Sequence, residues 1–193
     1  MSRKIFNYDD LTQSRVVPSL NAKSKLYTNT VSACGCLFYR IKSKKLQLLL
    51  IYYEDPNWPK LDDLGGQIDD SDDTIFDAIA RETSEETNNV ITKEYIMERF
   101  ADKKDIEEFY NQQSKYYVVL MKVKKTFHPD TEVFGNFEKT DKIKREIKWA
   151  DYETVKQNLA YRLLKNKKLM DYLDNLNNLS KKENSKENSK EKS

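Results

Sequence analysis

The chain of 193 residues lacks any long hydrophobic run. No apolar stretch approaches the ~20 residues that a membrane-spanning helix needs, and the first residues lack the apolar core of a signal peptide. We therefore expect a soluble, intracellular protein of the cytoplasm, with no membrane partner. The length indicates one domain with extensions, because about 150 residues suffice to bury a core.

Histidine and cysteine are also scarce, which argues against sites that depend on them. His128 is the only histidine and precedes Pro129 in a polar segment, so histidine-based catalysis is not expected. Cys34 and Cys36 are the only cysteines. They lie two apart in a predicted strand and point to one face, so we expect buried thiols, and neither a disulfide nor a zinc site. The net charge of +2 shows no overall basic field for nucleic acid.

Acidic residues are concentrated in the segment 64–90, LGGQIDDSDDTIFDAIARETSEETNNV. The pattern predicts a helix that continues to about Thr87, with a left-handed exit at Asn88 and Asn89. One of three polar residues is expected to cap it, and an apolar stripe turned away from the acids is expected to pack on a core. The cap candidates are Asp70, Ser71 and Asp72, and the stripe consists of Phe76, Ile79, Ala80 and Thr83.

Three glutamates share one face of this helix. Glu82, Glu85 and Glu86 lie at i, i+3 and i+4, and each exposed pair of like charges destabilises a helix by about 0.2–0.5 kcal/mol. A divalent cation between them would remove the repulsion. The other interpretation is a solvated acidic helix with salt bridges, in which Arg81 braces Glu85. The acids alone leave both interpretations open.

Order and spacing favour the metal site. The segment resembles the Nudix hydrolase signature G-x5-E-x7-R-E-U-x-E-E-x-G-U, where U is a bulky apolar residue. The residues that carry the resemblance are Gly66, Asp73, Arg81, Glu82, Glu85 and Glu86. The chain departs from the signature by one extra residue between Gly66 and Asp73, by Asp73 in place of Glu, by Thr83 in place of an aliphatic residue, and by Asn88 and Asn89 in place of Gly-U.

The resemblance implies a pyrophosphohydrolase in which Mg²⁺ or Mn²⁺ holds the phosphates while water attacks phosphorus. It implies a metal site made of Gly65, through its backbone carbonyl, with Glu82, Glu85 and Glu86. Glu82 would also be catalytic, binding a second metal or taking a proton from water. Arg81 would orient a glutamate, and Asp73 would brace Arg81 or the loop.

Nudix enzymes often place a further acid beyond the signature, which is called the Nudix box, as a base or an additional ligand. The candidates here are Glu138, Asp141 and Glu146. Glu146 is favoured because EIKWADYE resembles the strand-to-helix junction where many relatives carry that residue. The alternative is a surface glutamate among lysines.

The candidate substrate-binding residues are Tyr53, Trp58 and Lys60. They belong to the strand end and loop before the two glycines, where the rings can stack on a base and Lys60 can meet phosphate. Packing at the end of a strand is the alternative. The expected partner is a nucleotide pyrophosphate: dinucleotides, nucleoside diphosphate sugars, oxidised nucleotides and capped RNA, with mRNA decapping as the activity, are all open. A second hypothesis is a catalytically weak Nudix-fold module that binds a nucleotide or RNA.

The resemblance and the strand pattern predict a Nudix-type α/β/α sandwich, with a mixed sheet and the catalytic loop and helix on one side. Apolar runs at 31–39 and 46–53, split by the charged turn 42–45, predict a β-hairpin. Further strands are predicted at 95–100, 116–123 and 146–149, and a helix from about Tyr152.

The ends of the chain differ from its middle in composition. Residues 1–28 are expected to form an N-terminal arm, 29–178 the Nudix hydrolase domain, and 179–193 a disordered tail with a repeat of Lys, Glu, Asn and Ser. An apolar stripe precedes the tail on a helical pattern and is typical of core packing or a dimer seam, so the chain is a monomer or a homodimer. The stripe consists of Leu159, Leu163, Leu164, Met170, Leu173 and Leu176.

Overall fold

The computed structural model describes residues 6–7, 30–54, 61–124, 127, 131–139 and 143–190. Its main feature is a seven-stranded sheet in the order β5-β4-β3-β8-β7, with β6 pairing to β3 and β9 to β4. The sheet is mixed, because β3 and β8 are parallel and the other pairs are antiparallel. The strands are β3 (Ala33–Lys42), β4 (Lys45–Tyr53), β5 (Leu61–Asp62), β6 (Leu64–Gln67), β7 (Ile106–Asn111), β8 (Tyr116–Lys122) and β9 (Arg145–Asp151).

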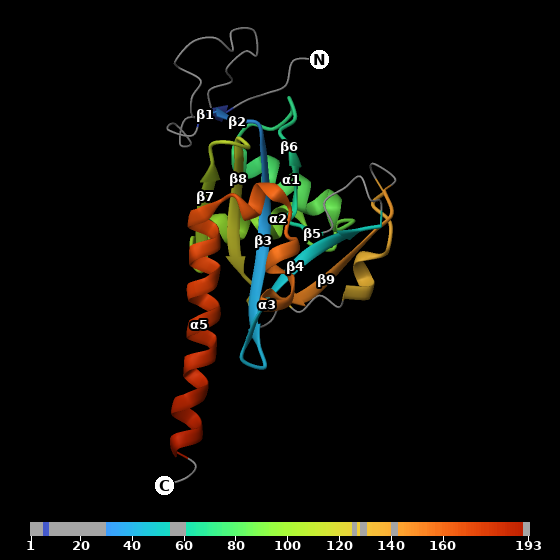
Figure 1. Ribbon diagram of the computed structural model, residues 1–193. Helices are drawn as coiled ribbons and strands as arrows, with labels where there is room; N and C mark the ends of the chain where they lie inside the picture. The colour runs from blue at the N-terminus through green and yellow to red at the C-terminus, as the bar shows by residue number, and fades with distance from the viewer. Residues whose placement is uncertain are drawn as a thin grey trace.

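Helices cover both faces of this sheet (Figure 1). The first core cluster lies between the sheet and α1 (Ile75–Glu86) with α2 (Lys93–Asp102). The second lies between the sheet and α3 (Tyr152–Val155), α4 (Tyr161–Leu164) and α5 (Lys167–Lys190). The remaining elements are the 3-10 helices η4 (Thr131–Phe134) and η5 (Lys156–Asn158) and the short pair β1 (Phe6–Asn7) and β2 (Thr30–Val31). The predicted α/β/α sandwich with a mixed sheet is confirmed.

The β3–β4 hairpin forms where the two apolar runs and the charged turn between them predict it. Its turn residues Ser43 and Lys44 have φ angles of 49° and 65°, which suit a tight turn between twisted strands. Cys34 and Cys36 are fully buried free thiols on the same face of β3, as predicted. This face is the one that α1 covers.

The strand predicted at 95–100 is wrong, because these residues belong to helix α2. The hydroxyl of Thr92 caps the helix by accepting a hydrogen bond from the backbone N–H of Tyr95. The two buried residues, Ile96 and Arg99, are three positions apart, which is a helical spacing. The guanidinium of Arg99 donates to the carbonyls of Lys104 and Lys122, and these bonds tie α2 to β8.

The apolar stripe before the tail packs into the core of the domain. Leu159, Leu163 and Leu173 are buried in the second cluster. The predicted tail boundary at 179 does not end the helix, because α5 continues to Lys190. Lysine and glutamate favour helices, and Lys181 pairs with Glu153 at 3.2 Å. The domain boundaries otherwise stay predictions.

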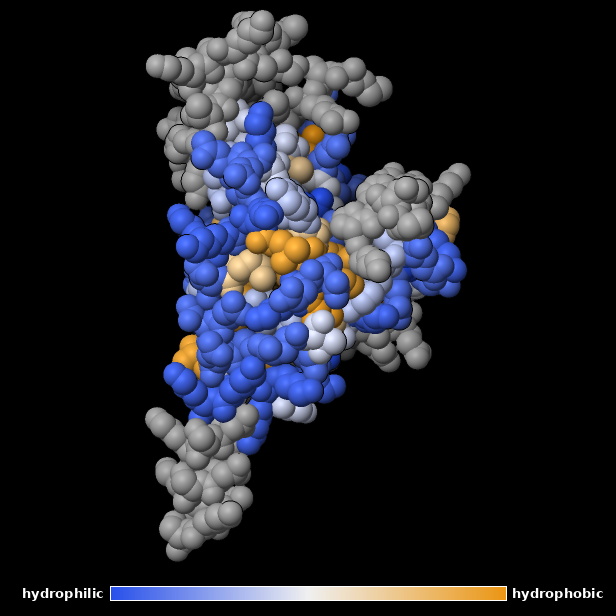
Figure 2. All heavy atoms as spheres, viewed as in Figure 1, coloured by the Kyte–Doolittle hydropathy of each residue, from blue (hydrophilic) through white to orange (hydrophobic). Residues whose placement is uncertain are grey.

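One face of the molecule carries an apolar patch. Figure 2 shows apolar side chains gathered over the α3–α4 segment, within a mainly hydrophilic face. Within the described part of the chain, no helix is both long and apolar enough to cross a membrane.

Candidate functional site

The candidate site lies where the β3–β4 hairpin opens. The two strands pair near their turn, from Tyr39 with Leu48 onward. Farther from the turn β3 pairs with β6 and β4 pairs with β5, so the β5–β6 segment enters between them. Gly66 of β6 pairs with Cys34 and lies against the side chain of Glu82 on α1. The glycine turn and the acidic helix therefore meet at one point.

Helix α1 begins later than the sequence predicts. Its N-cap is Thr74, and not Asp70, Ser71 or Asp72. The Thr74 hydroxyl accepts from the backbone N–H of Asp77, whose carboxylate in turn accepts from the backbone N–H of Thr74. This reciprocal capping box satisfies the backbone N–H groups of Thr74 and Asp77.

The rest of the helix matches its prediction. The stripe of Ile79, Ala80 and Thr83 is buried, and Phe76 packs against the same core. Asn88 and Asn89 follow the helix with φ angles of 53° and 63°, so the predicted left-handed exit is confirmed. The charged face of α1 is thus held at a fixed angle over β6.

Arg81 is the centre of the hydrogen-bond network at this site. Its Nε and Nη2 donate to the two carboxylate oxygens of Asp72, at 3.0 and 2.9 Å. Nη2 also donates to the carbonyl of Gln67, and Nη1 donates to both Glu82 and Glu85 at 2.9 Å. Burial alone would lower the pKa of Arg81, but the Asp72 hydrogen bond and the neighbouring carboxylates raise it. Arg81 therefore stays charged and fixes the glutamates.

The acid that braces Arg81 is Asp72; of the two roles predicted for Asp73, bracing Arg81 or the loop, the first is wrong. Asp72 is buried in the loop, whereas Asp73 is exposed beside the helix cap. Counting back from Arg81 selects Asp73, but counting forward five intervening residues from Gly66 selects Asp72. The extra residue of this chain thus lies after the acid and before the helix.

Glu82 rests against the backbone of Gly66. A Cβ on Gly66 would lie 2.4 Å from the Oε2 atom of Glu82, so only glycine leaves room for the carboxylate. Burial raises the pKa of Glu82 to about 7; Arg81 opposes this shift, and Glu85 and Asp72 add to it. The site therefore disfavours the charged form of Glu82 in the absence of a cation.

Glu86 faces a buried arginine that the sequence did not single out. Burial raises the pKa of Glu86 to about 8, opposed by the charge of Arg145 and assisted by Glu138 and Glu82. The Nε of Arg145 lies 3.4 Å from Glu86 Oε2, and its Nη2 donates to the Glu86 backbone carbonyl. Arg145 is 1% exposed, so this positive charge is committed to the end of α1.

Strand alternation separates Glu146 from the box. Arg145 points to the α1 face, so its neighbour Glu146 points to the opposite face, where its carboxylate is exposed and pairs with Lys148 at 2.6 Å. The prediction that Glu146 serves the site is therefore wrong. Glu138, the other described candidate, is buried and lies close enough to Glu86 and Arg145 for their charges to interact.

The remaining predicted residues divide into two groups. Tyr53 is half-buried on the α1 face of β4; burial raises its pKa, and the charge of Glu86 adds to the shift. It therefore lies near the site. Trp58, Lys60, His128 and Asp141 lie outside the described residues.

A second buried polar network adjoins the glycines and was missed in the sequence. Tyr116 donates to Asp63 at 2.7 Å, and the guanidinium of Arg162 contacts Asp63 and Asp62 at 3.1 and 3.0 Å. A Cβ on Gly65 would meet the Tyr116 hydroxyl at 2.5 Å, so Gly65 lies directly on this network. These residues are far apart in the chain, and no spacing rule connects them.

Two of the predicted metal ligands have surroundings that a divalent cation would compensate. Glu82 and Glu86 lie one turn apart with raised pKa values, and Glu86 Oε2 is buried without a hydrogen bond from the described residues. Carboxylate oxygens suit Mg²⁺ and Mn²⁺. Arg81 pairs with both Glu82 and Glu85 at 2.9 Å. In the described ranges, no group of three or more His, Cys, Asp or Glu side chains is arranged to hold a metal ion.

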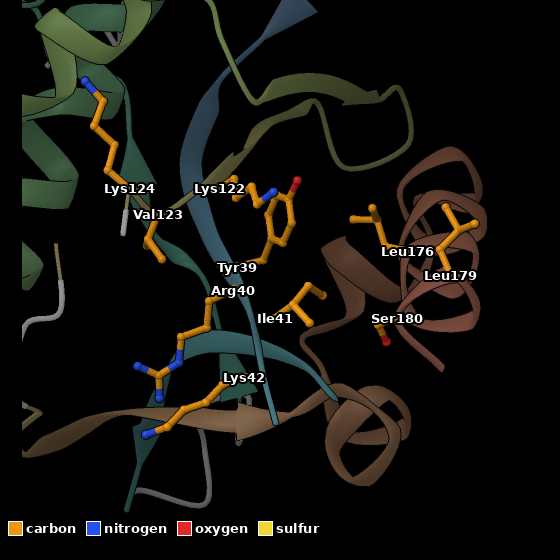
Figure 3. Close-up of a pocket in the computed structure, with 10 residues that line it drawn as sticks. All are labelled: Tyr39, Arg40, Ile41, Lys42, Lys122, Val123, Lys124, Leu176, Leu179 and Ser180. Atoms are coloured by element: carbon orange, nitrogen blue, oxygen red, sulfur yellow. The ribbon is translucent and has the colours of Figure 1, made fainter. Parts of the chain in front are cut away.

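A hollow of about 700 Å³ lies elsewhere, between the ends of β3 and β8 and helix α5 (Figure 3). Leu176 of α5 points toward Tyr39 across it, and Lys122 lines its wall. None of the predicted site residues lines this hollow. The chemistry inferred from the sequence therefore belongs to the site at α1.

Comparisons with known proteins leave the family open. No protein-family model and no curated protein matches the chain. The structure of a C. elegans Ap4A hydrolase binary complex is similar, with 21% identity and a TM-score of 0.43, over 74% of this chain and 98% of that one. A second C. elegans Ap4A hydrolase structure has 20% identity and a TM-score of 0.41, over 76% and 98%. At these values the likeness does not identify a function, which has to be argued from the residues of this chain.

Proposed function

We propose that the protein is a Nudix-type, metal-dependent pyrophosphohydrolase that cleaves a nucleoside diphosphate linked to another group. The observation that carries the proposal is the network of Arg81. One guanidinium binds the buried Asp72 and grips Glu82 and Glu85. This network fixes one acidic face of α1 beside the Gly66 backbone. A solvated acidic helix would need neither the buried brace nor the glycine.

The residues divide the work of binding between them. Glu82 and Glu86 would hold Mg²⁺ or Mn²⁺, which when bound withdraws charge from phosphate oxygens and acidifies a coordinated water. Arg81 orients Glu82, and Arg145 holds the end of α1 through the Glu86 carbonyl. Glu85 and the Gly65 carbonyl remain predicted ligands; Glu85, like Glu82, accepts from Arg81 through one carboxylate oxygen.

Hydrolysis also needs a group that accepts a proton. The oxygen of water forms a bond to one phosphorus, the bridging P–O bond breaks, and its electron pair leaves with the second phosphate. The proton lost by the water goes to a carboxylate. We assign this role to Glu138, because it is buried beside Glu86 and Arg145, whereas Glu146 faces the other side of the sheet.

The substrate class follows from the proposed chemistry and stays broad. Tyr53 near Glu86 supports a flat group such as a base beside the phosphates, and Trp58 and Lys60 remain predictions. Dinucleotide polyphosphates, nucleoside diphosphate sugars, oxidised nucleotides and capped RNA all contain the bond to be cleaved. A cytoplasmic location and a monomer or homodimer likewise remain predictions.

The proposal is tested by assaying turnover of these substrate classes in Mg²⁺ and Mn²⁺. We expect hydrolysis of at least one class, lost with chelator and reduced about 100-fold or more in Glu86→Gln. Glu98→Gln is the matched control, since Glu98 is an exposed helical glutamate on α2. Full activity of Glu86→Gln, or hydrolysis that persists in chelator, would contradict the proposal.

A second candidate function is a binding module that holds a nucleotide or RNA without efficient turnover. It is favoured by the engagement of both Glu82 and Glu85 with one nitrogen of Arg81, which leaves fewer carboxylates ready for metal. Saturable nucleotide binding without hydrolysis in either metal would support this candidate over the enzyme.

A further inference from the structure

Asn88 makes more contacts than a helix exit requires. It follows α1 in a left-handed conformation, with a φ of 53°. Its Nδ2 donates to the carbonyls of Phe134 and Phe137 at 2.8 and 2.9 Å, and its Oδ1 accepts from the backbone N–H of Lys139 at 3.2 Å. Both N–H groups and the oxygen of one amide are thus bonded to a segment about fifty residues away in the chain.

These contacts bracket Glu138. The carbonyl of the preceding residue and the N–H of the following residue both bind Asn88. The backbone N–H of Glu138 itself donates to the carbonyl of Ile143 at 2.8 Å, beside the antiparallel bridge between Phe137 and Lys144. The Arg145 backbone N–H donates to the carbonyl of Asn136 at 3.1 Å. These backbone pairings therefore hold Glu138 and Arg145 together at the end of α1.

The next residue of the chain shows that the conformation alone does not need these bonds. Asn89 is also left-handed, with a φ of 63°, but among the described residues its side chain makes a local contact, in which its Oδ1 accepts from the Ser84 hydroxyl at 2.8 Å. Glycine adopts such a φ without steric cost, and the Nudix signature has glycine at the position of Asn88. The asparagine side chain therefore adds contacts that the backbone geometry does not call for.

We propose that Asn88 is a positioning residue that docks the segment 131–139 onto the end of α1 and so holds Glu138 at the site. The inference rests on the proposed function, in which Glu138 accepts the proton of the attacking water. In this chain the hydrogen bonds of the Asn88 side chain thus take the place of a glycine that the signature has at this position.

The test compares Asn88→Gly with the matched control Asn89→Gly. Both substitutions place glycine in a left-handed position, so their effects on the backbone are alike. We expect Asn88→Gly to lower kcat roughly tenfold or more with little change in KM, and Asn89→Gly to change kcat by less than about twofold. Equal kcat values for the two variants would overturn the proposal.

A double-mutant cycle separates positioning from a general loss of structure. If Asn88 acts through Glu138, Glu138→Gln should lower kcat much less in the Asn88→Gly background than in the wild type. In the Asn89→Gly background its effect should be undiminished. Additive effects of Asn88→Gly and Glu138→Gln would contradict positioning, whatever the size of each.

Amide hydrogen exchange provides a readout that does not depend on activity. The Lys139 amide donates to Asn88, so its exchange should become faster in Asn88→Gly and stay unchanged in Asn89→Gly. Unchanged exchange in Asn88→Gly would show that the segment is not docked by this side chain. If the wild type hydrolyses no substrate, the proposed function fails, while exchange still decides the docking.

Discussion

Arg81 and the buried Asp72 form a bidentate pair, with Nε and Nη2 at 3.0 and 2.9 Å from the two carboxylate oxygens. The pair joins the loop before α1 to the charged face of the helix. Because Asp72 is 2% exposed, Arg81 and not water compensates its negative charge. Arg81 also forms ion pairs with Glu82 and Glu85. The position of the glutamates thus depends on an acid outside the helix.

Replacing Asp72 should be far more costly than replacing Asp73. Asp72→Asn leaves Arg81 without its main counter-charge, and we expect the free energy of unfolding to fall by about 2–3 kcal/mol. Asp73→Asn, at the exposed neighbouring position, should change it by less than about 0.5 kcal/mol. Urea unfolding of metal-free protein measures both. The reverse order of the two costs would show that the brace has been misassigned.

The two glycines of β6 should respond differently to alanine. A Cβ on Gly66 meets the end of the Glu82 side chain, which can move, whereas a Cβ on Gly65 meets the Cys34 carbonyl and the Gly35 Cα at 2.4 Å. Gly65→Ala should therefore destabilise the fold by about 1–3 kcal/mol or more. Gly66→Ala should unfold at nearly the wild-type urea concentration but lose about 10–100-fold in kcat, because Glu82 is displaced. Full activity of Gly66→Ala would remove Glu82 from the site.

Glu138 and Glu146 offer a second matched pair. Glu138→Gln should lower kcat by about 10²-fold or more, because the proton acceptor is lost. Glu146→Gln breaks only an exposed pair with Lys148 and should leave kcat and stability nearly unchanged. Initial rates at saturating substrate and metal distinguish the two. A loss confined to Glu146→Gln would contradict the strand register on which the assignment depends.

The stability of the metal-free protein should depend on pH through Glu82 and Glu86. Their folded pKa values, about 7 and about 8, are raised above the ordinary value of a glutamate. The folded state therefore binds more protons than the unfolded state between about pH 5 and 8, and the free energy of unfolding falls as pH rises through this window. In the double variant Glu82→Gln with Glu86→Gln, the free energy of unfolding should fall less over this pH window. An equally steep fall in that double variant would place the titrating groups elsewhere.

The sequence predicted the layers of the fold and the acids of α1 because both depend on local periodicity. Apolar runs located the β3–β4 hairpin and β8, and the spacing of Arg81 from the glutamates located the charged face of the helix. The segment 95–100 was wrongly predicted as a strand because a short apolar run fits both the strand period and the helix period. In the structure the Thr92 hydroxyl caps a helix here.

The parts that could not be predicted depend on contacts between distant segments. Arg145 reaches Glu86 because β9 pairs with β4, and only the folded chain brings Asn88 to the segment 131–139. Glu146 was preferred over Glu138 on a local likeness, and the face of the strand overturned this preference. Spacing from Gly66, and not only from Arg81, would have identified Asp72.

Binding of Mn²⁺ tests the central claim most directly. Calorimetric titration of the metal-free protein at neutral pH should show saturable uptake in the wild type and in Glu98→Gln. It should show none in the double variant Glu82→Gln with Glu86→Gln, because the carboxylates that would hold the ion are gone. Undiminished uptake in that variant, or no uptake by the wild type, would contradict the assignment of these glutamates as a metal site.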